Sequence, residues 1–227
     1  MIDVLHTLDL GFSQDVLGNI FWEWMHSTSC TATNKAQRVA ALWLEIQKYY
    51  KECKPPTRIN RLTEDMVKRS GKSRKFKGKL AETRHLVAFA LELAMEMNKS
   101  YGTTHSKTVK AMMANLYNFY ILMGSDAYDP QQAGDFARQC CILYTSLREE
   151  AEAAGKATLW KVKPKMHMFI EMAEGQSEEA GNPSDFWTYM DEDFMGFIGQ
   201  MAGSRGGKRE VSTTPVNVLK RYKGLIS

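Results

Sequence analysis

Apolar residues along the chain recur every three to four positions, the spacing of amphipathic helices, and rarely alternate as they do in strands. The spacing predicts helices over 13–25, 35–54, 80–98, 106–123, 130–154 and 184–201. Capping signals agree with these bounds, because Asn34, Asp129 and Ser184 can each cap a helix start and the Pro55-Pro56 pair ends one.

Strand signals are confined to Ile2–His6 and Leu159–Val162, and a short helix is expected from Thr63. The connections between 80–98, 106–123 and 130–154 are short, so these three helices are expected to pack side by side. The predicted fold class is therefore mainly α, a multi-helix bundle with at most a remnant of a sheet.

Composition places the chain among ordinary globular proteins. It has 227 residues, of which 44% are hydrophobic and 25% charged. No apolar run approaches the roughly 18–20 residues of a membrane span, and the N-terminus lacks the features of a signal peptide. The four cysteines have no C-x-x-C spacing. We therefore expect reduced thiols, an intracellular location and no membrane partner.

The most concentrated charge is a basic run, with seven lysines and arginines between positions 68 and 79. Gly71 and Gly78 interrupt it, which indicates a flexible connector. Together with lysines near Trp160 it would suit a phosphate backbone, and Phe76 and Trp160 could stack on bases. The alternative is a solvated loop. The candidate DNA-binding residues are Lys68, Arg69, Lys72, Arg74, Lys75, Lys77, Lys79, Lys161 and Lys163.

Acidic residues provide a second candidate chemistry. Asp191, Glu192 and Asp193 follow one another on the predicted helix 184–201, where successive side chains point about 100° apart. At most one or two of them can face a common site, and the alternative is a solvated face. Asp3, beside His6, could supply a second carboxylate to a two-metal centre, or it could be an ordinary capping residue. His167 is typical of a core histidine and could alternatively be a ligand.

Three segments, in order, resemble eukaryotic DDE transposases of the CACTA and KDZ/Plavaka-like groups. IDVLHTLDLGF is similar to their D-x-M-H segment, and KLAETRHLVAFALELA to the helix that follows it. KPKMHMFIEMAE and GNPSDFWTYMDEDFMGFI are similar to their K-x-H and W-T-x-R-F-E segments. Met190-Asp191 replaces the Arg-Phe pair, and the early strands with the first catalytic acid have no counterpart.

The resemblance implies an RNase H-like fold with a helical insertion, cutting DNA with Mg²⁺ or Mn²⁺. It makes Asp3 and Glu192 the metal-binding catalytic acids, supported by His6, Lys165, His167 and Asp193. It also implies a core strand over 1–12, a helical insertion over 13–155, a return to the core over 156–203 and a basic tail over 204–227. The chain is then expected to be the C-terminal part of a longer transposase.

The predicted function is a transposase-derived, DNA-binding region that is non-catalytic as an isolated chain. The alternatives are a two-metal nuclease or strand-transferase region using Asp3 and Glu192, and an unrelated helical interaction protein. Expected partners are DNA and either the N-terminal part of the same transposase or a second copy of the chain. The resemblance and the basic run together imply a nuclear location.

The nuclease alternative makes its own prediction. The purified chain should nick supercoiled plasmid in the presence of Mn²⁺, and Glu192→Ala should abolish nicking by removing a metal ligand. Agarose-gel conversion of supercoiled to open-circular plasmid measures it. Equal nicking by the two proteins would contradict the assignment of Glu192.

Overall fold

A computed structural model describes residues 2–67, 69–70, 73–186 and 188, with the side chains of 69 and 70 left out. The residues up to Phe186 form one compact unit. The predicted helix beyond 186, the basic tail, and Glu192 and Asp193 lie outside the described residues. Helices on both sides of positions 12 and 155 pack against one another, so the domain boundaries predicted there do not divide this unit.

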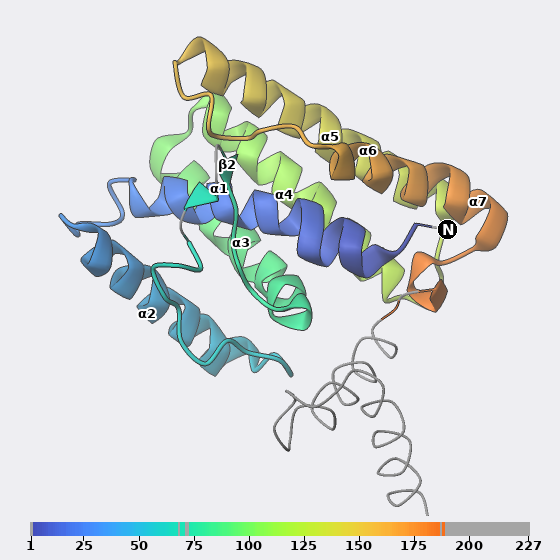
Figure 1. The fold of residues 1–227 in the computed structure, drawn as a ribbon, viewed down its shortest axis with the longest axis horizontal. Helices are drawn as coiled ribbons and strands as arrows, with labels where there is room; N and C mark the ends of the chain where they lie inside the picture. The colour runs from blue at the N-terminus through green and yellow to red at the C-terminus, as the bar shows by residue number, and fades with distance from the viewer. Residues whose placement is uncertain (1, 68, 71–72, 187, 189–227) are drawn as a thin grey trace, which may run out of the picture. The chain divides into compact units, whose positions relative to one another are not determined.

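The described residues are mainly helical, as predicted (Figure 1). The long helices are α1 (Ser13–Met25), α2 (Lys35–Cys53), α3 (Leu80–Tyr101), α4 (Thr104–Met123) and α5 (Pro130–Ala153). The shorter ones are η1 (Leu5–Phe12), α6 (Pro164–Glu171), η2 (Met172–Gln176), α7 (Ser177–Ala180) and η3 (Pro183–Phe186). The sheet in this part of the chain is a two-residue antiparallel pair, β1 (Arg69–Ser70) and β2 (Ser73–Arg74).

Local signals in the sequence explain where most long helices begin. The Asn34 side chain accepts a hydrogen bond from the Gln37 N–H at 2.9 Å and caps α2. Thr103 caps α4 in the same way, and Asp129 caps α5 ahead of Pro130. The short helix expected from Thr63 is a turn. No helix among the described residues is long and apolar enough to cross a membrane.

Both predicted strands are wrong. Residues 5–12 form a π-helix continuous with α1. Leu5 and Leu8 in it are fully buried, as is Val4, which precedes it. Because the adjacent residues Val4 and Leu5 are both buried, the segment lacks the alternation of buried and exposed positions that marks a strand. In Leu159–Val162, Leu159 and Trp160 are both buried, and Trp160 has a φ of 51°, which a strand cannot accommodate.

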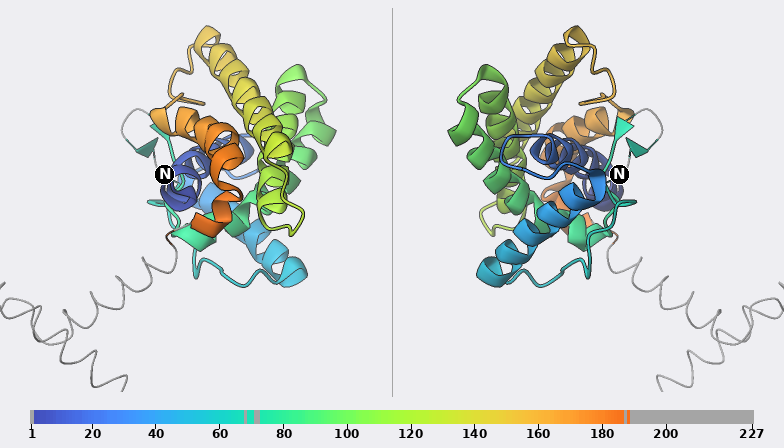
Figure 2. Two further views of the ribbon diagram at one scale, coloured as in Figure 1. Left: turned by 90° about the vertical axis from the view of Figure 1, so that its right-hand side faces the viewer. Right: turned by 90° about the vertical axis from the view of Figure 1, so that its left-hand side faces the viewer.

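Helix α1 and the π-helix before it lie at the centre of the unit (Figure 1). They contact α2, α3, α6 and β2, while α3, α4 and α5 pack side by side in sequence order, as their short connections predict (Figure 2). Every residue from Leu5 to Phe21 is buried except His6 and Leu10. This helical segment therefore lies at the centre of the core, to which the surrounding helices also contribute.

The segment 73–79 is held against α1, which corrects the expectation of a flexible connector over this stretch. The Phe76 N–H donates to the Gln14 carbonyl at 2.8 Å, and the Gln14 side-chain amide donates to the Gly78 carbonyl at 2.8 Å. Phe76 is fully buried, with its ring edge-on to Phe21 at 5.4 Å between centroids. It therefore cannot stack on a base.

A glycine on α1 makes this contact possible. A Cβ at Gly18 would lie 2.6–2.7 Å from the backbone N, Cα and C of Lys75. We predict that Gly18→Ala lowers the free energy of unfolding by about 2 kcal/mol through steric overlap with Lys75. This loss outweighs the intrinsic preference of a mid-helix position for alanine over glycine. Chemical denaturation measures this.

Gly124→Ala is the matched control, because a Cβ there would meet its nearest atoms at an ordinary 3.6 Å. Its stability should stay within about 0.5 kcal/mol of the native protein. Equal stabilities for Gly18→Ala and Gly124→Ala would show that the segment is not held tightly against α1.

Candidate functional site

Lys75, Lys163 and Lys165 all contact the first helix, Lys75 from the segment 73–79 and the other two from the start of α6. Two of them bind backbone carbonyls. The Lys75 ammonium donates to the Leu10 carbonyl at 3.0 Å. The Lys165 ammonium, from α6, donates to the His6 carbonyl at 2.6 Å and lies 3.5 Å from the Leu10 oxygen. These carbonyls belong to the π-helix, where Gly11 leaves helical geometry at φ −119° and ψ −105°. The lysines therefore satisfy backbone acceptors at a break in the helix.

A buried carboxylate balances part of this charge. Asp15 on α1 is 5% exposed and accepts a hydrogen bond from the Lys163 ammonium at 2.5 Å. Burial raises the pKa of Asp15, and the bond from Lys163 opposes that shift. Burial likewise lowers the pKa of Lys75, with Asp15 opposing and Lys165 and Lys163 adding to the decrease. The sequence pattern did not single out Asp15, because α1 also carries other polar residues such as Gln14 and Asn19.

Beside Lys75 the surface is hollowed into a basic groove of about 580 Å³. Among the described residues, four cationic side chains and one carboxylate, that of Glu82, line it. The Glu82 carboxylate also accepts the Lys79 N–H at 2.8 Å and caps α3. The groove is lined by Gln14, Ile59, Asn60, Arg61, Met66, Lys75, Lys77, Gly78, Lys79 and Glu82. This set is called the basic groove below.

The basic groove combines residues that sequence analysis selected with one that it missed. Lys77 and Lys79 are exposed, and Lys75 is half-buried and fixed by its bond to Leu10. Arg61, also exposed, comes from the loop after α2 and adds the fourth charge. Arg61 stands outside the basic run, so only the packing of its loop beside Gln14 reveals it.

The other predicted DNA-binding residues lie elsewhere. Arg74 lies over the Trp22 ring, 4.9 Å from its centroid, and Lys163 is paired with Asp15. Lys161 is half-buried, and its carbonyl accepts a hydrogen bond from the Tyr144 hydroxyl at 3.3 Å. Lys68 and Lys72 lie outside the described residues, as does the side chain of Arg69.

Three residues matched to the transposase pattern, Asp3, His6 and Lys165, lie together in space beside the N-terminal segment. One carboxylate oxygen of Asp3 lies 2.9 Å from the His6 backbone N–H and 2.7 Å from its ring Nδ1. Lys165 binds the carbonyl of the same histidine. His167 is exposed on α6, so its assignment as a core histidine is wrong. Within the described residues no group of three or more acidic, histidine or cysteine side chains is arranged to hold a metal ion.

The metal site predicted from Asp3 and Glu192 stays a prediction, because Glu192 and its neighbour Asp193 lie outside the part of the chain that the structure describes. Mg²⁺ or Mn²⁺ would therefore still depend on a carboxylate that the described residues do not include.

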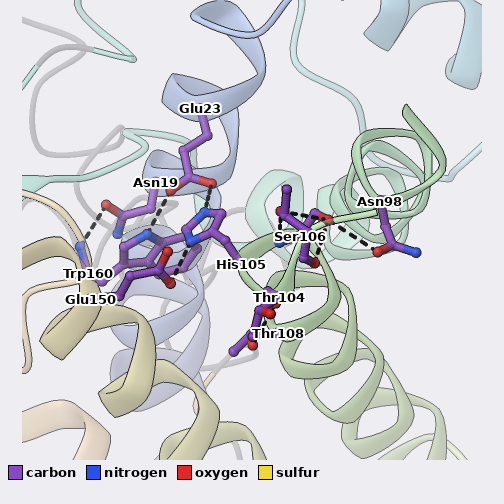
Figure 3. A network of polar contacts seen from close by, with 10 residues as sticks. Asn19, Glu23, Asn98, Thr104, His105, Ser106, Thr108, Glu150 and Trp160 are labelled. Carbon is purple, nitrogen blue, oxygen red and sulfur yellow. Dashed lines mark hydrogen bonds and ion pairs between the residues drawn. The ribbon is translucent and has the colours of Figure 1, made fainter. Parts of the chain in front are cut away.

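A second polar cluster lies at the other end of α1, and sequence analysis missed it (Figure 3). His105 on α4 stands between two carboxylates, with Nε2 3.0 Å from Glu23 and Nδ1 2.9 Å from Glu150. The Trp160 indole N–H donates to Glu23 at 2.8 Å, and the Trp160 backbone N–H donates to the Asn19 side chain at 3.0 Å. Trp160 is fully buried, so it cannot stack on a base either.

The two carboxylates control the charge of His105. The bond to Glu23 raises the pKa of His105 to about 9 against the opposing effect of burial, and Glu150 adds to the increase. Both ring nitrogens are then protonated donors at neutral pH. One imidazolium thus ties together α1, α4 and α5.

This arrangement predicts a loss of stability in alkaline solution. The stabilisation is fully present below the ordinary histidine pKa of 6.5 and is lost as pH rises through about 9. We expect the protonated His105 to contribute about 2 kcal/mol to the free energy of unfolding at pH 7. This is less than the whole pKa shift would give, because Glu150 is half-exposed and solvent screens its charge. The melting temperature measured from pH 7 to pH 10 follows this loss.

Glu23→Gln is the control, because it removes the strongest partner of His105 and returns the histidine pKa toward its usual value. Its melting temperature should fall less between pH 8 and pH 10 than that of the native protein. Parallel decreases in the two proteins would contradict the assignment.

Comparison with models of protein families, with curated protein sequences and with solved structures finds no match to this chain. The arrangement of charges is therefore the basis for a functional assignment.

Proposed function

We propose that this chain is a DNA-binding region that holds the phosphate backbone in the basic groove. The observation that carries the proposal is the meeting of Arg61, Lys75, Lys77 and Lys79 in one hollow, which has one carboxylate among its described lining residues. Binding phosphates with several such cations releases condensed counterions, which supplies much of the affinity of proteins for DNA.

The way the groove is built suits a repeating anion. Lys75 is held by the Leu10 carbonyl, so one charge has a fixed position before any ligand binds. Lys77 and Lys79 are exposed and alternate along the same extended segment, and Arg61 faces them from another loop. Fixed and mobile cations together can follow successive phosphates with little ordering of the protein on binding.

The resemblance to DDE transposases favours DNA over other polyanions and brings with it a nuclear location and the remaining transposase segments as partners. The proposal concerns binding alone. It needs no divalent metal, so binding should persist in EDTA, whereas the two-metal alternative requires Mg²⁺ or Mn²⁺.

The test removes three exposed charges from the groove. We expect the triple variant Arg61→Gln, Lys77→Gln, Lys79→Gln to bind a fluorescent 20-base-pair duplex roughly 10- to 100-fold more weakly at 100 mM salt. The slope of log affinity against log salt should become shallower by about 2 to 3, since three phosphate contacts are lost. Fluorescence anisotropy from 50 to 200 mM salt, with EDTA present, measures both quantities.

The control variant carries Lys51→Gln, Lys99→Gln and Lys107→Gln, which removes the same net charge from exposed positions outside the basic groove. It should keep nearly the native slope. Equal losses in the two triple variants would mean that overall charge, and not the groove, attracts DNA. Absence of binding by the native chain at 50 mM salt would reject the proposal.

A further inference from the structure

A second hollow, of about 490 Å³, lies where α1 and α3 end, α4 begins and α5 ends. Its apolar wall includes Met97, Val109 and Leu159, all buried core residues. Its polar wall is the Glu23–His105–Glu150 cluster of Figure 3. Pockets of this volume with apolar walls and a few converging polar groups are typical of sites for small molecules or parts of larger ligands. This hollow is called the end cavity below.

Helix α1 connects the end cavity to the basic groove. Gln14, Gly18 and Trp22 are spaced four residues apart and share one face of the helix. Segment 74–78 follows that face: Gly78 bonds Gln14, the Lys75 backbone lies over Gly18, and Arg74 lies over Trp22. Gln14 lines the groove and Trp22 lines the end cavity.

Gln14 and Trp22 are eight positions apart, which corresponds to a rise of about 12 Å along the helix. This is roughly the axial length of three to four nucleotides of one DNA strand. A strand whose phosphates occupy the basic groove therefore reaches the end cavity within a few nucleotides.

The chemistry of the end cavity selects what could enter it. Trp22 lies at the margin, with the ring of His26 stacked on it at 4.3 Å and Arg74 on the ring at 4.9 Å. Glu150 is half-exposed, and within the described residues one of its oxygens is bonded, to His105. The other oxygen is an acceptor for an amino group beside apolar walls. An exocyclic amino group on a planar ring meets both requirements.

From these observations we propose that the end cavity receives an amino-bearing nucleobase, adenine or cytosine, from a single strand held in the basic groove. The inference rests on the proposed DNA-binding function. A base must leave its stack to enter a cavity, which is easiest in single-stranded DNA. The backbone is then bound by the groove and one base is recognised by the cavity.

The experiment uses the full chain and a 12-nucleotide oligothymidylate whose central position is adenine, cytosine, thymine or an abasic site. We expect the adenine or cytosine oligonucleotide to bind about tenfold more tightly than the thymine and abasic ones. Ala154→Phe fills the end cavity from an exposed position and should remove this preference while leaving the salt slope unchanged. Glu150→Gln should reduce the preference without filling the cavity.

Ala153→Phe is the matched control, because the neighbouring residue is equally exposed and does not line the cavity. It should keep the full preference. Equal binding of all four oligonucleotides by the native chain, or a preference unchanged by Ala154→Phe, would overturn the nucleobase site and leave the groove proposal standing. Binding of the 20-base-pair duplex without binding of any of the four oligonucleotides would overturn the nucleobase site alone, whereas absence of binding to duplex and oligonucleotides alike would overturn both proposals.

Discussion

The helix from Leu5 to Met25 is enclosed by the rest of the unit, yet it carries polar side chains into the interior. Burying a polar group without a partner costs about 1–3 kcal/mol, and more for a charge, so most of these groups are paired. Among the described residues, the Thr7 hydroxyl and the Trp24 indole N–H are the exceptions on this helix. The partners come from segments far away in the sequence. The pairs are Asp9 with Tyr120, Gln14 with Gly78, Asp15 with Lys163, Asn19 with Trp160, and Glu23 with His105.

These pairs determine how the surrounding helices and loops are placed. The Tyr120 hydroxyl donates to Asp9 at 2.5 Å and lies 2.9 Å from the Ser13 hydroxyl, which sets α4 against the first helix. Burial beside Asp9 keeps the pKa of Tyr120 well above its usual value, so the hydroxyl stays a donor. Each end of the helix then contacts a different group of neighbours, and two separate polar sites result. One lies around Lys75 and the other around His105.

The break at Gly11 gives the basic side its particular form. The Leu10 and His6 carbonyls that accept from Lys75 and Lys165 lie beside this break, and a Cβ at Gly11 would overlap the Lys165 side chain. Lys75 and Lys165 thus donate hydrogen bonds to backbone carbonyls of the core, although their sequence positions alone suggest that they are free to bind a ligand. The residues left to contact a ligand are the exposed Lys77 and Lys79 and the neighbouring Arg61.

The amino-acid sequence alone determined the mainly helical fold, because apolar spacing and capping residues such as Asn34 and Asp129 act over a few neighbouring positions. It also located Lys75, Lys77 and Lys79, because their charges are adjacent along the chain. Local pattern failed at Ile2–His6, where the adjacent residues Val4 and Leu5 are both buried, and at Phe76, whose burial is imposed by distant segments. Only the tertiary structure decided that Arg61 joins the groove, that Asp15 pairs with Lys163 and that His105 stands between Glu23 and Glu150. Each of these contacts joins residues that the sequence separates widely, so no local spacing can encode it.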